Sequence, residues 1–212
     1  GQDPALAELV SRIPNAVQAS SRAIKHASDT VTPQGIVAAA TMPAPRPSVD
    51  PAETLALILD GIADPGNAGA LLRSALGAGV RTVIASRHCV DLFSPKVVRG
   101  GMGAHFHLKL AVEVSWTDIR RMLGQAREVV VAEAHAPLAY YRYDWCRSAA
   151  LVVGGEARGP SPEALKMATA RVCIPLEPEV ESLNAAVAGS VIVFEAKRQR
   201  EEAGGRKAER RE

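Results

Sequence analysis

The sequence predicts an α/β fold, built as a mostly parallel sheet with helices on both faces. Short apolar runs alternate with helix-like stretches along most of the chain, which is typical of parallel strands joined by crossover helices. The 212 residues are 47% hydrophobic and 23% charged, so the chain can bury a full core. This composition indicates a globular protein with one large domain and room for a further fragment.

The expected elements follow one another in a regular order. Strands are predicted at 55–59, 81–85, 104–112, 128–134, 149–155 and 171–176. Helices are predicted at 4–13, 68–80, 116–126, 161–168 and 184–203. Ligands of open α/β sheets bind beyond the carboxyl ends of the strands. The loops to inspect are therefore 60–67, 132–136, 154–160 and 175–184.

Proline and charge divide the chain into four predicted parts. The stretch "TMPAPRPSVDPAET" carries four prolines, which favours an extended linker at 42–53 between a segment 1–41 and a domain 54–203. From Lys197 onward seven basic and four acidic side chains give +3, against +2 for the whole chain, and 204–212 is a basic tail. Such a tail suits phosphate contacts, although a solvated helix end is the commoner explanation.

Cysteine and hydropathy patterns point to a particular compartment. Cys89, Cys146 and Cys173 are scattered, so neither a zinc site nor a disulfide framework is indicated. No signal peptide or membrane-spanning run is apparent, and we expect a reduced, cytoplasmic protein.

The first loop, "DGIADPGNAGALLRSA", spaces two glycines as a phosphate-binding P-loop does. Asn67-Ala68 stands where that motif needs Lys-Ser/Thr, so nucleotide triphosphate binding is excluded. Asn67 at the end of a turn is expected to cap the following helix, and Arg73 is either a surface charge or a functional residue.

The second and third loops combine glycines and polar residues at strand ends. In "VVGGEARGPSPE", Gly154 and Gly155 allow close backbone approach and precede Glu156, while Ser161 marks a helix start. The loop is either a tight strand-to-helix connection or part of a site. In "IPLEPEVESLNAAVAGSVIVFEA", Ser182 or Asn184 is expected to cap the long helix.

Together the three loops resemble, in order and spacing, the three motifs of the SpoU/TrmH branch of the SPOUT methyltransferases. The resemblance rests on "DPGNAGALLRSALGAGV", "LVVGGEARG" and "IPLEPEVESLNAAVAGSVIVFEA", and covers about residues 55–200. It implies a SPOUT-type α/β knot with a C-terminal trefoil knot, one of the rare exceptions to unknotted topology. The segment "SDTVTPQGIVAAA" is similar to the end of an L30e-like RNA-binding domain, of which 1–41 is then a remnant.

The resemblance also implies a cofactor, a reaction and a set of site residues. S-adenosylmethionine (SAM) binds with its adenine among Gly154, Ile174 and Leu183, with Gly155 and Leu176 beside them, and no metal is involved. The reaction is methyl transfer to a ribose 2′-hydroxyl of RNA, with ribosomal RNA favoured over transfer RNA. The expected partners are RNA and a second copy of the chain in a homodimer.

The same resemblance assigns candidate catalytic roles. Arg73 acts on the ribose hydroxyl; because a guanidinium is effectively never deprotonated, orienting the ribose and stabilising oxyanion charge suit it better than acting as base. Asn67 and Glu156 position Arg73 or the substrate, and Glu156 is the alternative proton acceptor. Ser182 and Asn184 hold polar groups near the methionine or the RNA.

Several features are open or depart from the family pattern. Relatives commonly read Arg-Ala-Ser-Met-Gly where this chain has Gly101 in place of the serine. His105 and His107 are expected on one face of a strand, and with no third ligand they predict no metal. The aromatic run 140–145 either stacks on bases or packs a loop against the sheet, and Cys146 and Cys173 are expected to be buried.

Two other functions compete with the methyltransferase hypothesis. One is a knotted RNA-binding or dimerisation module without catalysis. The other is a nicotinamide-dependent α/β enzyme, against which the lack of G-x-G-x-x-G speaks.

Overall fold

The computed structural model describes residues 4–28, 30–42, 49–50, 52–124 and 127–209. Contacts between Cα atoms divide the chain into two units, Gly1–Pro43 and Ala44–Glu212. The first unit contains helices α1 (Pro4–Ser11) and α2 (Ser21–Ala27), and Ser20 caps α2 by accepting a hydrogen bond from the Ala23 N–H. The predicted boundaries of linker and tail stay predictions; the linker residues 43–48 and 51 lie outside the described residues.

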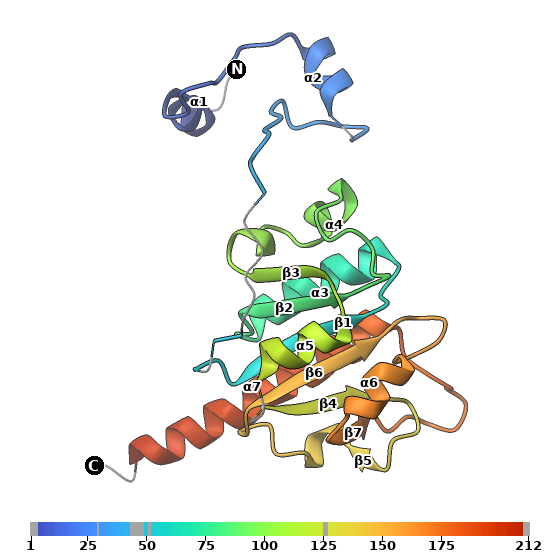
Figure 1. Cartoon of the computed structure of the whole chain (residues 1–212). Coiled ribbons are helices and arrows are strands. Elements are labelled where there is room, and N and C mark those ends of the chain that lie inside the picture. The colour runs from blue at the N-terminus through green and yellow to red at the C-terminus, as the bar shows by residue number, and fades with distance from the viewer. Residues whose placement is uncertain (1–3, 29, 43–48, 51, 125–126, 210–212) are drawn as a thin grey trace. The chain divides into compact units, whose positions relative to one another are not determined.

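The second unit is an α/β domain around a parallel sheet of seven described strands (Figure 1). The strands lie in the order β3-β2-β1-β6-β4-β7-β5. Their bounds are β1 Leu55–Asp60, β2 Thr82–Ser86, β3 Lys109–Val114, β4 Glu128–Ala132, β5 Leu138–Ala139, β6 Ala149–Gly154 and β7 Ala170–Cys173. The expected fold class is therefore confirmed at the level of a parallel α/β sheet.

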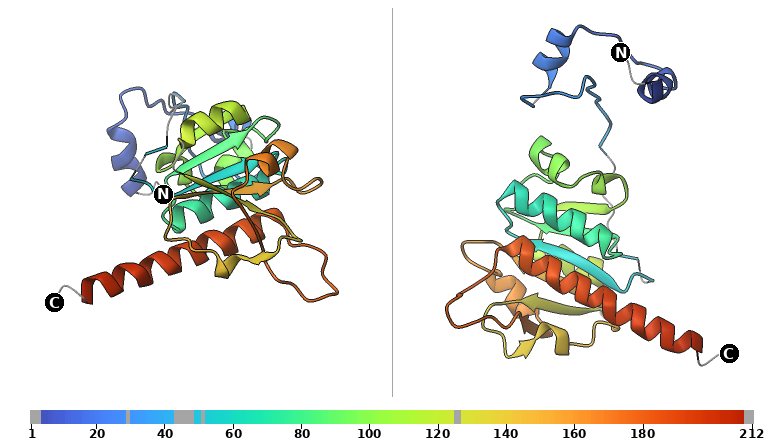
Figure 2. Two further views of the ribbon diagram at one scale, coloured as in Figure 1. Left: turned by 60° about the horizontal axis from the view of Figure 1, so that its bottom comes forward. Right: turned by 180° about the vertical axis from the view of Figure 1, so that it is seen from behind.

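Helices cover both faces of this sheet. They are α3 Pro65–Gly77, α4 Pro95–Gly100, α5 Trp116–Leu123, α6 Pro162–Met167 and α7 Ala185–Glu209, with 3-10 turns η1 Ala104–Phe106 and η2 Tyr140–Arg142. Figure 1 shows α5 and α6 over one face, and Figure 2 shows α3 and α7 side by side over the other. Among the described residues, no helix is long and apolar enough to cross a membrane.

Alternation along the strands produces the two cores. Leu55, Leu57 and Leu59 of β1 pack in the larger cluster with α3 and α7, and Ala56 and Ile58 pack in the smaller cluster with α5 and α6. Successive side chains of a strand point to opposite faces, so a strand buried on both faces is apolar throughout. This explains why "LALIL" shows no polar alternation.

Gly189 brings α7 close to the sheet. A Cβ at this position would lie 2.5 Å from Leu71 Cδ2 of α3 and 3.0 Å from Val153 Cγ2 of β6. Any larger side chain would therefore push α7 away from both neighbours. Ser190, the next residue, donates a hydrogen bond to Ser74 of α3 over 2.7 Å.

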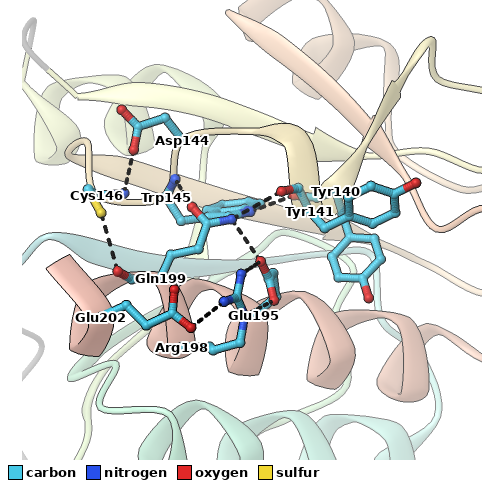
Figure 3. A network of polar contacts seen from close by, with 9 residues as sticks. All are labelled: Tyr140, Tyr141, Asp144, Trp145, Cys146, Glu195, Arg198, Gln199 and Glu202. Carbon is cyan, nitrogen blue, oxygen red and sulfur yellow. Dashed lines mark hydrogen bonds and ion pairs between the residues drawn. The ribbon is translucent and has the colours of Figure 1, made fainter.

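The aromatic run 140–145 packs a loop onto α7 (Figure 3). The loop also packs against the sheet, as one of the two interpretations expected, because the Tyr143 hydroxyl donates to Glu128 of β4 over 2.7 Å. Trp145 is fully buried, its Nε1 donates to the Tyr140 carbonyl, and its backbone N–H donates to Gln199 Oε1 over 3.0 Å. Gln199 Nε2 in turn donates to Glu195. The prediction that Cys146 is buried was wrong: it is exposed, with its Sγ 3.6 Å from the Gln199 carbonyl oxygen.

The expected strand at 104–112 was partly wrong. Residues 104–106 form η1, and β3 begins at Lys109, so His105 and His107 do not share a strand face. Gly103, with φ of 85°, supplies the left-handed residue that ends the preceding turn and starts η1. Other missed elements are the short helix α4 and the two-residue strand β5, both too short for a periodic signal.

Candidate functional site

A cavity of about 420 Å³ lies at the carboxyl ends of β4, β6 and β7. Its volume is within the range of about 300–1,000 Å³ that small-molecule sites occupy. Eight of the ten predicted site residues line it: Gly154, Gly155, Glu156, Ile174, Leu176, Ser182, Leu183 and Asn184. The expectation that ligands bind beyond the carboxyl ends of the strands therefore located the cavity. The strand β7 ends at Cys173, so Ile174 belongs to the following loop and not to the expected strand.

Two glycines shape the near wall of this cavity. A Cβ on Gly154 would lie 2.2 Å from the Pro160 nitrogen, and one on Gly155 would lie 2.4 Å from the Gly61 carbonyl oxygen. Both contacts are with backbone, which cannot swing aside as a side chain does. The loop is thus a tight strand-to-helix connection and a cavity wall at once, so the two interpretations of "VVGGEARG" do not exclude each other.

Three polar side chains from distant parts of the sequence form a hydrogen-bonded chain beside the cavity. Asn67 Nδ2 donates to Glu156 Oε1 over 2.6 Å, and Asn184 Nδ2 donates to Asn67 Oδ1 over 2.9 Å. The three residues come from α3, the loop after β6 and the N-terminus of α7. These two hydrogen bonds therefore connect all three predicted motifs.

The orientation of both asparagine amides follows from the cap of α7. Asn184 Oδ1 accepts hydrogen bonds from the Ala186 and Val187 N–H groups, so its Nδ2 must point away from the helix, toward Asn67. Asn67 then has to present Oδ1 to Asn184 and Nδ2 to Glu156. The expected cap at Asn184 is confirmed.

The expected cap at Asn67 was wrong. The N-cap of α3 is Asp64, whose carboxylate accepts from the Asn67 backbone N–H over 2.8 Å, with Pro65 in the first turn. Because Asp64 performs the capping, the side chain of Asn67 is available for Glu156 and Asn184. Ser161, by contrast, caps α6 as predicted, accepting from the Ala164 N–H.

Glu156 is held as an ionised carboxylate. Partial burial alone would raise its pKa, but hydrogen bonds from Asn67 and from backbone N–H groups, including that of Ala63, lower the pKa below its ordinary value. A carboxylate with a lowered pKa is a weaker base. The geometry therefore favours a positioning role for Glu156 over proton abstraction.

Arg73 is not brought into the cavity of its own chain. It lies exposed on α3 and makes no hydrogen bond or ion pair with another described residue. Gly77 lies four residues later, on the same face of α3. Its backbone contacts the Phe194 ring of α7, because a Cβ at this position would lie 3.4 Å from Phe194 Cζ. Arg73 thus belongs to the surface that α3 and α7 share.

Further cavity residues were missed because no motif names them. Ala132, Glu133 and Ala134 line the cavity from the end of β4, a loop that the strand-end rule indicated without singling out a side chain. Ala188 and Ile192 of α7 also contribute, and helical spacing alone would assign both to the core. Only the packing of α7 across the strand ends shows their position.

Gly101, the departure from the family pattern, is matched to its surroundings. A Cβ at Gly101 would lie 2.9 Å from His105 Cε1, and His105 Nε2 lies 2.7 Å from the Leu92 carbonyl oxygen, which identifies Nε2 as the protonated nitrogen. The His105 ring thus occupies the space that a serine side chain would need. Among the residues described, no group of three or more His, Cys, Asp or Glu side chains is arranged to hold a metal ion.

Comparison with known proteins agrees with this geometry. The profile of the SpoU rRNA Methylase family matches residues 54–194. The chain belongs to this family. The matched segment runs from the residue before β1 into α7 and so contains the whole cavity and the Glu156–Asn67–Asn184 chain.

Relatives and solved structures of the SpoU family extend the match. The human "rRNA methyltransferase 3, mitochondrial" is 34% identical over 233 residues, covering 83% of this chain and 56% of that protein. The Bacillus subtilis "23S rRNA (guanosine(2553)-2'-O)-methyltransferase RlmP" is 29% identical, and the match covers 82% of this chain and 69% of the Bacillus protein. The chain spans about half the length of the first of these relatives.

Among solved structures, the SpoU methyltransferase AviRb from Streptomyces viridochromogenes in complex with the cofactor AdoMet superposes with a TM-score of 0.64. It is 29% identical, and the match covers 76% of this chain and 64% of AviRb.

Proposed function

We propose that this chain carries a SAM-dependent RNA methyltransferase activity, directed at a ribose 2′-hydroxyl, with ribosomal RNA favoured over transfer RNA. The observation that carries the proposal is the cavity at the strand ends, joined to the Glu156–Asn67–Asn184 chain. Family membership and the names of the relatives, which include rRNA methyltransferases, support the same reaction and substrate class.

The cavity suits SAM chemically. Ile174, Leu176 and Leu183 offer apolar surface for a flat adenine ring, and Gly154 and Gly155 expose backbone groups that can read its edge. Glu133, Glu156 and Ser182 add polar groups for the charged methionine end. When bound, SAM supplies a sulfonium-activated methyl group, so the protein mainly has to align it with a weakly acidic alcohol.

The chain's own residues then perform positioning and charge stabilisation. Asn184 fixes the start of α7 and the orientation of Asn67, and Asn67 holds Glu156 against the Ala63 N–H. Arg73, through its guanidinium group, orients the ribose and stabilises negative charge developing on its oxygen. Ionised Glu156, through its hydrogen bonds, holds the loop after β6 in place at the cavity.

A homodimer is part of the proposal, because Arg73 lies outside the cavity of its own chain. Val187 and Phe194 of α7 are 50% and 47% exposed, and with the half-buried Val191 they form an apolar stripe at helical spacing. The Phe194 ring borders Gly77, one turn after Arg73. Pairing two copies through this stripe would cover the apolar surface and carry Arg73 toward the partner's cavity.

The trefoil knot and the RNA-binding remnant complete the proposal. The strand β7 lies between β4 and β5, whereas α7, which follows it, packs on α3 and β6. Residues 174–184, which connect β7 to α7, therefore pass the carboxyl ends of β4 and β6, beside the loop that follows β6. This crossing supports a knotted connection. In the first unit, Arg22, Lys25 and His26 of α2 line one surface hollow, which supports contact with RNA phosphates by segment 1–41.

Methyl transfer from radiolabelled SAM to unmodified ribosomal and transfer RNA tests the proposal, after SAM binding has been measured by calorimetry. Products are digested with alkali, because label in alkali-resistant dinucleotides identifies 2′-O-methylation. Arg73→Ala should bind SAM with unchanged affinity and transfer methyl groups at least about a hundredfold more slowly. Arg81→Ala, at an exposed arginine before β2, is the matched control and should retain activity.

The outcomes separate the competing functions. Label in ribosomal RNA supports the proposal as stated, and label only in transfer RNA changes its substrate. SAM binding without transfer to either RNA favours a knotted RNA-binding or dimerisation module. No SAM binding, with a nicotinamide cofactor bound instead, would overturn the proposal.

A further inference from the structure

Asp60, at the carboxyl end of β1, is a buried carboxylate that lies outside the cavity. The residue is 4% exposed, and its carboxylate accepts three hydrogen bonds: from Ser86 Oγ over 3.0 Å, from Trp116 Nε1 over 3.3 Å and from the Ser161 N–H over 2.6 Å. All three donors are neutral. Burying a carboxylate among neutral donors costs free energy, so packing alone does not account for an aspartate at this position.

The two ends of one loop are fastened to this single residue. The Gly155 N–H donates to the Asp60 backbone carbonyl over 2.9 Å, and the Ser161 N–H donates to the Asp60 carboxylate at Oδ2. Between them, the Gly159 N–H donates to the Gly155 carbonyl and closes the loop on itself. We call residues 155–161 the clamped loop.

The two carboxylate oxygens of Asp60 have different tasks. Oδ1 accepts from Ser86 and Trp116, which hold the carboxylate itself in place, and Ser86 Oγ also accepts from the Gly61 N–H. Oδ2 faces the clamped loop and accepts only from Ser161 among the described residues. Contacts on the Oδ1 side therefore anchor the clamp, and the contact on the Oδ2 side holds the loop.

The clamped loop forms one side of the cavity. Four of its residues line the cavity: Gly155, Glu156, Gly159 and Pro160. Among the described residues, the bridge between Gly155 and Gly159 is the only strand-like pairing within this loop. Loops without ladder hydrogen bonds open at low free energy unless other contacts hold them.

We propose that Asp60 is a positioning residue for the cofactor cavity: through Ser161 and Gly155 it holds the clamped loop in its binding conformation before the cofactor arrives. This inference rests on the proposed function for the identity of the cofactor, but not for the clamp. An asparagine at position 60 has nearly the same shape and one acceptor oxygen fewer. If its oxygen serves Ser86 and Trp116, its NH₂ group faces the Ser161 N–H, and two donors meet.

The test compares Asp60→Asn with Asp144→Asn, the same substitution at an aspartate that lies in the 140–145 loop outside the cavity and accepts from the Cys146 N–H. Calorimetry should show that Asp60→Asn weakens SAM binding about tenfold or more, and that Asp144→Asn stays within about twofold of the wild type. Hydrogen exchange without ligand should show faster deuterium uptake in residues 155–161 of Asp60→Asn. Uptake in β1 and β6 should be unchanged in both variants.

A purely structural role would give another pattern. If Asp60→Asn lowers the melting temperature but the folded protein binds SAM as the wild type does, with unchanged exchange in 155–161, the inference is overturned. Should the variant not fold, the wild type alone decides: its Ser161 amide should exchange as slowly as strand amides, and fast exchange would overturn the clamp. If wild-type protein binds no SAM, the proposed function fails, while the exchange comparison still decides the clamp.

Discussion

Asn67 and Glu156, 89 positions apart in the sequence, are joined by a hydrogen bond of 2.6 Å from Asn67 Nδ2 to Glu156 Oε1. The bond connects the start of α3 to the loop after β6. Because Asn184 fixes the orientation of the Asn67 amide, the three predicted motifs act as one unit and not as three separate contacts.

Glu156→Gln should separate positioning from proton abstraction. The amide keeps one acceptor for Asn67 but places an NH₂ group opposite the Ala63 N–H, so the loop shifts and methyl transfer falls about tenfold. A general base would cost about 10²–10⁴-fold instead. Single-turnover rates measure the difference, and a loss in the larger range would contradict the positioning role.

The pH dependence of SAM binding should follow the ionisation of Glu156. In the folded protein the pKa of Glu156 is lowered below its ordinary value of 4.5. The stabilisation of the folded loop by ionised Glu156 is therefore complete above pH 4.5, and it is lost as the pH falls through the lowered pKa. SAM affinity should therefore be flat between about pH 5 and 8 and decline only below that window. Calorimetric titrations across pH test this, and Glu156→Gln should lack the acidic decline.

Gly154→Ala should disrupt the cavity wall. The added Cβ would meet the Pro160 nitrogen at 2.2 Å, so the loop has to move, at a cost of about 1–3 kcal/mol in the free energy of unfolding and with loss of SAM binding. Gly204→Ala is the control: it lies exposed in α7 with open space around it, and should stabilise by about 0.5–1 kcal/mol. Denaturant unfolding and calorimetry report the two effects.

Phe194→Ser should weaken self-association if the apolar stripe of α7 is the dimer interface. Removing the ring takes apolar area from the contact, so the apparent mass from light scattering should shift toward the monomer at low micromolar concentration. Tyr141→Ser is the matched control, because Tyr141 is 48% exposed against 47% for Phe194 but lies in the 140–145 loop, outside the stripe. Equal masses for all three proteins would contradict this interface.

Gln199→Ala should destabilise the domain without touching the cavity. Its side chain accepts from the Trp145 N–H and donates to Glu195, so truncation leaves a backbone donor beside a buried ring and costs about 1–2 kcal/mol. Glu202→Ala is the control: it removes an exposed ion pair between Glu202 and Arg198, which lies one turn before it, and should leave the melting temperature unchanged. SAM binding of the folded Gln199→Ala protein should be unaltered.

Local chemistry made much of this protein predictable from its sequence. The strands β1, β2, β4 and β6 are apolar runs because both faces of a parallel sheet are buried. Of the loops that the strand ends marked, those after β4, β6 and β7 line the cavity. The caps of α6 and α7 were predicted because a serine or asparagine side chain satisfies N–H groups only a few residues away.

Competition between neighbouring residues was not predictable in the same way. Asp64 and Asn67 can both cap α3, and the pattern does not show which one does; the structure gives the cap to Asp64 and leaves Asn67 for Glu156. The alternation around His105 and His107 is typical of a strand, but the left-handed turn at Gly103 starts a 3-10 helix there.

The sequence by itself determined the fold class, the three loops and eight residues of the cavity lining, because strand burial, turn chemistry and the motifs are properties of short segments. Only the tertiary structure decided how these segments act on one another. It joined Glu156 to Asn67 and Asn184, placed Arg73 on the surface shared by α3 and α7, and set Asp60 beneath the clamped loop. Those relationships depend on contacts between residues far apart in the chain, which are fixed only when the whole sheet and its helices pack.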